Sequence, residues 1–276
     1  MDVRCVVDDA VQRSSALWGE HGVGFLIEAE GGRVLLDTGQ SGTVLLHNLD
    51  ILGMEATTID AVAISHAHYD HTGGLPMLLE YLDPGTPLYA NPDLFRERYS
   101  VRDDELEDVG MTLAREELID HMSLMLDAEP REIIPGVWTT GTITERPEIE
   151  GSSEYHRMRE GGELVPDAYL DDLALVLELD EHLALVCGCC HAGLINTLAH
   201  VERVFKRPVK VIAGGLHLTS VSEEELDRIC RVLAGRPALE RVYPNHCTGE
   251  AAFVALTCEL GASVVRPCPA GTVLAL

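Results

Sequence analysis

Four side chains that commonly bind metal ions lie within six consecutive positions, namely His66, His68, Asp70 and His71. They directly follow the apolar run Ile59 to Ser65, which predicts a buried strand. Because residues two apart point the same way at a strand end, His66 and His68 are expected to share one ion. The chain then turns, so Asp70 and His71 face a second position beside the first. Imidazole and carboxylate donors suit Zn²⁺, with iron and manganese as alternatives.

The competing interpretation of this motif is a polar cluster that packs without metal. Burying several unpaired imidazole and carboxyl groups together is costly, so a centre that holds one or two ions explains the motif better. In such a centre Asp70 is predicted to be catalytic as well as metal-binding, because a carboxylate there can orient or deprotonate a water molecule. The residues themselves therefore indicate a metal-dependent enzyme.

The same residues match the HxHxDH motif of the metallo-β-lactamase-fold hydrolases, and the chain resembles that family. The preceding Leu35-Leu36-Asp37-Thr38-Gly39 is similar to the strand and turn that come before this motif in the family. The resemblance implies that Asp37 supports the metal ligands from behind. It also implies an α/β fold of the four-layer αββα type, in which water activated by metal attacks a small ester or phosphoester.

Two later motifs extend the resemblance and include one departure from it. The family commonly has Gly-Asp at a strand end, with the Asp bridging two metals, where this chain has Cys187-Gly188-Cys189-Cys190-His191. Either Cys189 or His191 is a candidate ligand there; we prefer His191 and place Cys189 beside the site. The run Pro244 to Gly249 resembles the segment that carries the family's final strand-end histidine, so His246 is expected to bind the second ion.

One further histidine of the family, a ligand of the first metal, has no obvious counterpart between these motifs. The candidates are His121, His156 and His182, none of which has the usual flanking residues. Asp171 and Asp172 lie close to where that histidine normally falls. The resemblance therefore leaves the complete ligand set of the first metal open.

Several short motifs together resemble one subgroup of the family. They are Glu20-His21-Gly22, the Gly-Cys-Cys-His-Ala-Gly run, Gly214 to Leu218, and Pro244 to Gly249. That subgroup includes archaeal dihydropterin-(ribofuranosyl)aminobenzene-phosphate synthases of methanopterin biosynthesis. The resemblance implies that His21 and His217 line the pocket. It leaves two alternatives to a hydrolase, a synthase-like transferase and a di-iron redox protein.

The secondary-structure elements predicted to position these residues fall into two parts of the chain, and each part has a hairpin followed by helices. The expected hairpins are Val23 to Ala29 with Arg33 to Asp37, and Leu173 to Glu178 with Leu183 to Cys187. Helical spacing of apolar residues predicts helices over Gly42–Leu52, His191–Phe205, Glu223–Leu233 and Gly249–Leu260. This alternation favours two sheets between two layers of helices, in a single domain over residues 1–276.

The middle of the chain, about residues 100–172, is rich in charge and weak in apolar periodicity. It predicts helical pieces and long loops, with a strand at Gly136 to Thr140, and long loops of this kind are often functional lids. We expect this insertion to select the substrate. Glu145, Arg146 and Arg159 are its candidate contacts, since the guanidinium fork of Arg suits a phosphate.

The charge and hydropathy of the chain limit the classes of partner that it is expected to bind. The 276 residues carry a formal net charge of −26, so binding to nucleic acid or an anionic membrane through bulk charge is not expected. No run of 18 apolar residues predicts a membrane span, and residues 1–10 do not resemble a secretory signal. The eight cysteines are then expected as thiols in a reducing cytoplasm. The expected partner is a small, anionic substrate drawn to the metal centre; the oligomeric state is not predicted.

Overall fold

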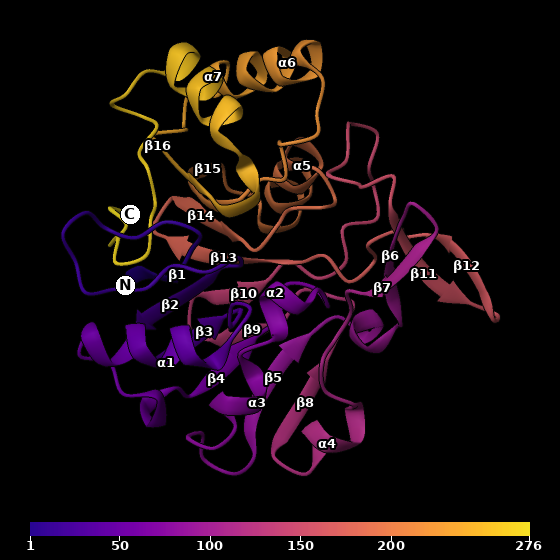
Figure 1. Cartoon of the computed structure of the whole chain (residues 1–276). Coiled ribbons are helices and arrows are strands. Elements are labelled where there is room, and N and C mark those ends of the chain that lie inside the picture. The colour runs from indigo at the N-terminus through magenta and orange to yellow at the C-terminus, as the bar shows by residue number, and fades with distance from the viewer.

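Two six-stranded sheets face each other in the computed structural model, which describes residues 1–276 (Figure 1). The first sheet has the strand order β1-β2-β3-β4-β5-β8, and the second β16-β15-β14-β13-β10-β9. The strands of the first are β1 Asp2–Val7, β2 Gly24–Ala29, β3 Gly32–Leu36, β4 Ala61–Ala63, β5 Thr86–Ala90 and β8 Met122–Leu126. Those of the second are β9 Glu132–Ile134, β10 Val137–Thr139, β13 Ala174–Leu179, β14 His182–Cys187, β15 Val209–Gly215 and β16 Arg241–Asn245.

Helices cover the outer face of each sheet. The first sheet carries α1 Gly42–Ile51, α3 Leu75–Leu78 and α4 Arg115–Ile119; the second carries α5 Leu194–Phe205, α6 Glu223–Ala234 and α7 Glu250–Leu260. One apolar core lies between the sheets, and one lies beneath each helical layer. The strands alternate between these cores: in β3, Val34 and Leu36 face the central core, whereas Leu35 faces the helices. The predicted four-layer αββα sandwich is confirmed.

Both predicted hairpins form, as β2–β3 and β13–β14, because each is a pair of apolar runs separated by a short polar turn. The predicted buried strand over residues 59–65 is shorter, with only Ala61–Ala63 in the sheet as β4. The chain then leaves the sheet and enters the single turn α2, Tyr69–Thr72. This early departure places the residues of the first histidine motif in a loop at the strand end.

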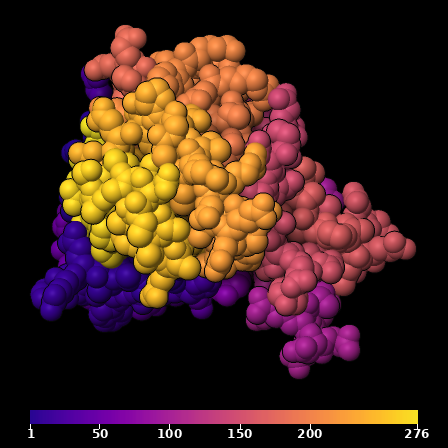
Figure 2. Space-filling view, turned by 90° about the horizontal axis from the view of Figure 1, so that it is seen from above, coloured from indigo at the N-terminus to yellow at the C-terminus, as the bar shows by residue number.

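The segment predicted as helical pieces and long loops has one short helix, α4, and a long loop over residues 140–153, but most of its regular elements are strands, so the expectation of several helical pieces is wrong. The strand predicted at Gly136 to Thr140 is present as β10. A small third sheet, of order β12-β11-β6-β7, consists of β6 Arg98–Arg102, β7 Glu105–Asp108, β11 His156–Glu160 and β12 Glu163–Pro166. It projects from the body of the molecule (Figures 1 and 2). Residues of β7 are exposed throughout, so no alternation of buried and exposed positions marks β7 in the sequence.

The chain also has three short 3₁₀ helices, at Ala56–Thr58, Pro92–Phe95 and His246–Thr248. The second of these lies between β5 and β6. None of the helices has the length and apolar character needed to cross a membrane.

Candidate metal centre

The side chains of the site come from loops at one edge of the sandwich. Strands β3 and β4 run parallel in the first sheet, and β14, β15 and β16 run parallel in the second. The loops that follow these strands supply Asp37, residues 65–71, residues 188–191, His217 and His246. Crevices at the carboxyl ends of parallel strands are the usual ligand-binding places of α/β folds.

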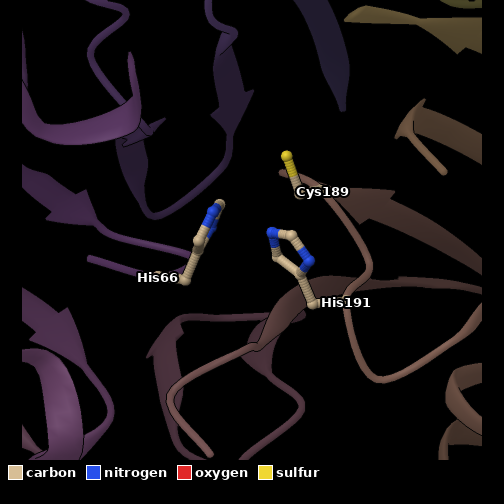
Figure 3. Close-up of side chains that lie close together, drawn as sticks. All are labelled: His66, Cys189 and His191. Carbon is tan, nitrogen blue, oxygen red and sulfur yellow. The ribbon is translucent and has the colours of Figure 1, made fainter. Parts of the chain in front are cut away.

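A first cluster of donors contains His66, His68 and His191, together with the Cys189 sulfur. His66 Nε2 lies 3.0 Å from His68 Nδ1, and the donor atoms of His66, Cys189 and His191 all lie within 4.8 Å of one another (Figure 3). All four residues are buried. Burial, followed by neighbouring imidazoles, holds the pKa of His66 well below its ordinary value, and neutral imidazole is the form that binds metal.

A second cluster surrounds the carboxylate of Asp70. Its Oδ2 atom lies 3.4 Å from His21 Nε2, 3.5 Å from His71 Nε2 and 3.3 Å from His246 Nε2. Burial would raise the pKa of Asp70, but His71 and His246 outweigh it and hold that pKa well below its ordinary value. Cys189 Sγ lies 3.1 Å from His71 Nε2. The two clusters are therefore adjacent, with the Cys189 sulfur close to both.

Asp37 lies directly behind the histidines, in the place that the resemblance implies. Its Oδ2 is 2.7 Å from His71 Nδ1, and its Oδ1 accepts the Ser65 N–H at 2.7 Å. The Ser65 hydroxyl donates to Asp37 and lies 2.9 Å from His66 Nδ1. A Cβ on Gly188 would come within 2.1 Å of that hydroxyl oxygen, so only glycine lets the two loops meet there.

The sequence analysis did not single out Asp9, which connects two imidazoles of the second cluster. Its two carboxylate oxygens lie 3.0 Å from His21 Nδ1 and 3.1 Å from His246 Nδ1. A carboxylate that holds the far nitrogen of a ligand imidazole fixes its tautomer and orientation. The neighbouring Asp8 accepts the backbone N–H of His246 at 2.9 Å. The available signal was the acidic pair that directly follows the first apolar run, a strand end like those that carry the histidines.

The three candidates for the missing histidine fall in different places. His121 is an exposed residue before β8, and His182 begins β14 opposite Leu179 in the hairpin. His156 lies beside the first cluster, with its ring centroid 4.8 Å from that of His68. Its Nδ1 is 2.9 Å from the hydroxyl of Tyr169. The structure therefore places only His156 near the site.

Asp171 and Asp172, which lie near the expected position of that histidine, bind backbone. Asp171 accepts the N–H of Ala67 at 2.8 Å, and Asp172 accepts the N–H of Ala192 at 2.7 Å. Each acceptor thus holds the loop beside a candidate ligand. Both carboxyls are buried, and burial raises their pKa values to about 6 and about 7.

Two aromatic rings flank His191. The ring of Tyr169, which the sequence analysis missed, stacks on it with 4.1 Å between centroids and 9° between planes. The ring of His217 lies 4.2 Å away on a tilted plane. His217 Nδ1 is buried without a hydrogen-bond partner, and its φ of +46° is unusual for a residue other than glycine. The structure therefore places His217 beside His191, one of the candidate ligands.

The proposed substrate contacts in the middle of the chain bind protein groups. Arg146 donates to the carbonyls of Ala168 and Tyr169, each at 2.8 Å, and so holds the segment that stacks on His191. Arg159 pairs with Glu97 on the small sheet. Glu145 pairs with Arg203. These contacts give the three residues roles within the protein.

The donor set fits a transition metal. His68 Nε2 and His191 Nε2 are both buried without a hydrogen-bond partner, and buried polar atoms in folded proteins normally have one. The imidazole, thiol and carboxylate donors form two adjacent groups. Each group has the donors needed to bind one ion. Imidazole and sulfur donors favour zinc and its neighbours in the first transition series over magnesium or calcium.

Two proteins of Methanocaldococcus jannaschii are similar to the chain over most of its length. A 7,8-dihydropterin-6-methyl-4-(beta-D-ribofuranosyl)-aminobenzene-5'-phosphate synthase is 26% identical over 255 residues, which cover 88% of this chain and 86% of that protein. The uncharacterized protein MJ0448 is 28% identical over 260 residues, or 92% of each chain.

Solved structures show the same architecture. Tm1679, described as a metal-dependent hydrolase of the beta-lactamase superfamily, has a TM-score of 0.85 at 28% identity and covers 100% of this chain and 99% of its own. Zn(2+)-bound PqqB from Methylobacterium extorquens has a TM-score of 0.57 at 12% identity, with 100% of both chains covered, and is alike in fold alone. The sequence profile of the metallo-beta-lactamase superfamily matches residues 18–157, half of the chain and the part that carries the histidine motif, and the chain belongs to this superfamily.

Proposed function

We propose that the chain is a metal-dependent hydrolase that acts on a small anionic ester or phosphoester. The observation that carries the proposal is the pair of adjacent donor clusters. His66, His68 and His191 would hold one ion, and Asp70, His71 and His246 the other, with His21 beside Asp70. Bound divalent ions supply Lewis acidity and lower the pKa of water towards about 7. Zinc is the proposed metal, with iron and manganese as alternatives.

Asp70 has the central role among the protein groups. Its pKa is held well below the ordinary value by His71 and His246, so the carboxylate stays ionised at neutral pH. A base that takes up a proton at neutral pH needs a pKa close to 7. Asp70 would therefore act by holding and orienting the attacking water, and the proton would pass to a stronger base or to solvent.

The exposure of the site residues supports one route for a substrate to the centre. His66, His71 and His191 are buried, whereas the side chain of His21 is 55% exposed and His217 is partly exposed. The proposed entry for the substrate lies between His21, beside the second cluster, and His217, beside His191 of the first cluster. Bound ions would make this opening attractive to an anionic substituent, although the chain as a whole is strongly acidic.

The relationship to the M. jannaschii synthase supports a second candidate function, a transferase that releases pyrophosphate from a dihydropterin substrate. In that reaction Asp70 and the imidazoles would hold ions whose Lewis acidity stabilises the pyrophosphate leaving group. The two functions differ in their products, because only the hydrolase consumes water.

A substrate screen on metal-loaded protein tests the proposal. Chelated protein would be reloaded with zinc, manganese or iron and given phosphomonoesters, phosphodiesters, lactones and thioesters. A parallel assay would follow pyrophosphate release from a dihydropterin diphosphate, with and without a (ribofuranosyl)aminobenzene phosphate as the acceptor. We expect hydrolysis that needs metal and stops on chelation. Pyrophosphate release without any hydrolysis would favour the transferase. Failure to bind metal after reconstitution would show that the proposed centre is wrong.

Replacing Asp9 with asparagine is expected to weaken binding of the second ion by about 10- to 100-fold, the usual effect of losing a carboxylate behind a histidine ligand. An amide keeps one acceptor oxygen and so cannot serve the Nδ1 atoms of both His21 and His246. Competition with a chromophoric chelator measures the two affinities separately.

The first ion should bind this variant as it binds the wild type, because His66, His68 and His191 do not contact Asp9. The matched control is Asp50→Asn, an exposed acid on α1. Equal weakening of both ions would contradict the assignment of Asp9 to the second cluster.

A further inference from the structure

Cys189 lies at the point where the two donor clusters meet. It follows β14 in the turn before α5 and is 3% exposed. Its sulfur belongs to the group with His66 and His191 and also to the group with His71 and His246, and the donor atoms within each group lie within 4.8 Å of one another. Figure 3 shows His66 and His191 reaching the sulfur from separate loops. Cys189 is the one residue that these two groups have in common.

We propose that the Cys189 thiolate is a ligand shared by both metal positions, a sulfur bridge between the ions. The inference rests on the proposed metal centre and adds to it the atom that joins its two halves. On loading, the S–H bond breaks, the proton leaves to solvent, and two sulfur lone pairs bind one ion each. No electron is transferred in this step.

The surroundings of Cys189 differ from those of the structural cysteines in the same run. Cys187 and Cys190 are members of the apolar core beneath α5, and Cys190 Sγ contacts the Thr197 hydroxyl at 3.4 Å. Cys189 belongs to none of the three apolar cores. Its sulfur instead lies 3.1 Å from His71 Nε2. Burial alone therefore does not account for a cysteine at this position.

The unpartnered nitrogen of His191 is an independent sign of a ligand at this point. His191 Nε2 is fully buried and has no hydrogen-bond partner, while its Nδ1 is fixed at 2.5 Å from the carbonyl of Gly151. An ion bound to His191 and Cys189 would supply the missing partner. His71 is oriented in the same way from the other side, by Asp37 on its Nδ1.

A sulfur bridge has a consequence for metal choice. Thiolate is a soft ligand that favours zinc, cobalt or cadmium, whereas carboxylate favours harder ions such as manganese. The wild-type centre should therefore prefer zinc and cobalt to manganese. Cys189→Asp, which puts a carboxylate at the same place, should shift the preference towards manganese.

Cobalt titration of metal-free, reduced protein tests the bridge directly. Thiolate bound to Co²⁺ gives a sulfur-to-metal charge-transfer band in the near ultraviolet, which imidazole and carboxylate do not. In the wild type this band should grow through the first and the second equivalent of cobalt. In Cys189→Ser the band should be absent, and both ions should bind at least about 100-fold more weakly. Loss of a residue that only orients a metal ligand costs up to about 100-fold in affinity, and loss of a ligand itself should cost no less.

Two controls identify the sulfur. Cys190→Ser, next in the chain but packed in the core, should keep the band and both affinities. Cys247→Ser should keep the band as well, although Cys247 lies in a third group with Cys189 and His217. Should Cys189→Ser fail to fold, Cys189→Asp provides the same test, since it should bind two ions without the band.

The outcomes separate this inference from the proposed function. A band that persists without Cys189, or one that saturates at a single equivalent, overturns the sulfur bridge. Two bound cobalt ions with no band in the wild type also overturn it and leave the metal-dependent hydrolase standing. A wild-type protein that binds no cobalt overturns both.

Discussion

Replacing Asp70 with asparagine is expected to lower kcat on the hydrolysed substrate by about 10²-fold or more, the usual cost of misplacing a reacting group by about 1 Å. One carboxylate oxygen faces three imidazole nitrogens at 3.3–3.5 Å. Asparagine has almost the same shape but no charge, so these imidazoles lose the anion between them and the attacking water loses its fixed acceptor. The fold should survive, because the side chain keeps its volume.

Turnover and metal content should be measured on the same Asp70→Asn preparation. We expect the second ion to be lost or much weakened and the first to remain, as judged by elemental mass spectrometry after gel filtration. Asp50→Asn again serves as the control, since it removes one acidic charge from an exposed position on α1. Full metal content with turnover near that of the wild type would show that Asp70 is not part of the reacting site.

The first histidine motif could be recognised from the sequence because its geometry is local. Four ligating side chains at a strand end can face only a few directions, whatever the rest of the chain does. The αββα layers were also predictable, because β3 and β13 carry apolar residues on both faces and the helices have an apolar stripe. In both cases the signal lies within about ten neighbouring residues.

The residues that were missed act across long sequence separations. Asp9 meets His246 from a position 237 residues earlier in the chain, and that contact exists only because β1 and β16 end at the same edge of the sandwich. Tyr169 stacks on His191 from the far end of the middle segment. Tyr169 stands next to no motif. The strand-end position of Asp9 is a local signal, but it does not identify His246 as the partner.

The small third sheet is fixed to the metal centre by a buried arginine. Arg98, on β6, is 1% exposed and lies among three carboxylates. Its Nη2 is 2.7 Å from Asp171 Oδ1 and 3.1 Å from Asp93 Oδ2, and its Nε is 3.0 Å from Asp167 Oδ2. Asp171 in turn accepts the N–H of Ala67, between two candidate ligands. The sheet expected to select substrate and the loop expected to hold metal thus share one ion-pair network.

Replacing Arg98 with methionine is expected to lower the free energy of unfolding by about 3–5 kcal/mol, the usual cost of leaving buried charges without their partner. Three carboxylates would then share a closed space with no counter-charge. Chemical denaturation of the metal-free protein measures the change. Arg102→Met is the matched control on the same strand; it is exposed, and its effect should stay within about 0.5 kcal/mol. An equal loss in both variants would assign the effect to the strand instead of the network.

The pH dependence of that loss identifies the carboxylates as its cause. Burial already raises the pKa of Asp171 to about 6, against the lowering effect of Arg98, and removing Arg98 raises it further. A carboxyl whose pKa is higher in the folded than in the unfolded protein stabilises the fold below its unfolded pKa, and this stability is lost as pH rises through the folded value. The deficit of Arg98→Met should therefore be larger at pH 8 than at pH 5. Adding Asp167→Asn and Asp171→Asn should restore much of the stability at pH 8, because amides fill the same space without charge. A deficit that is independent of pH and persists in the triple variant would mean that packing of the arginine side chain, and not its charge, holds the small sheet against the metal centre.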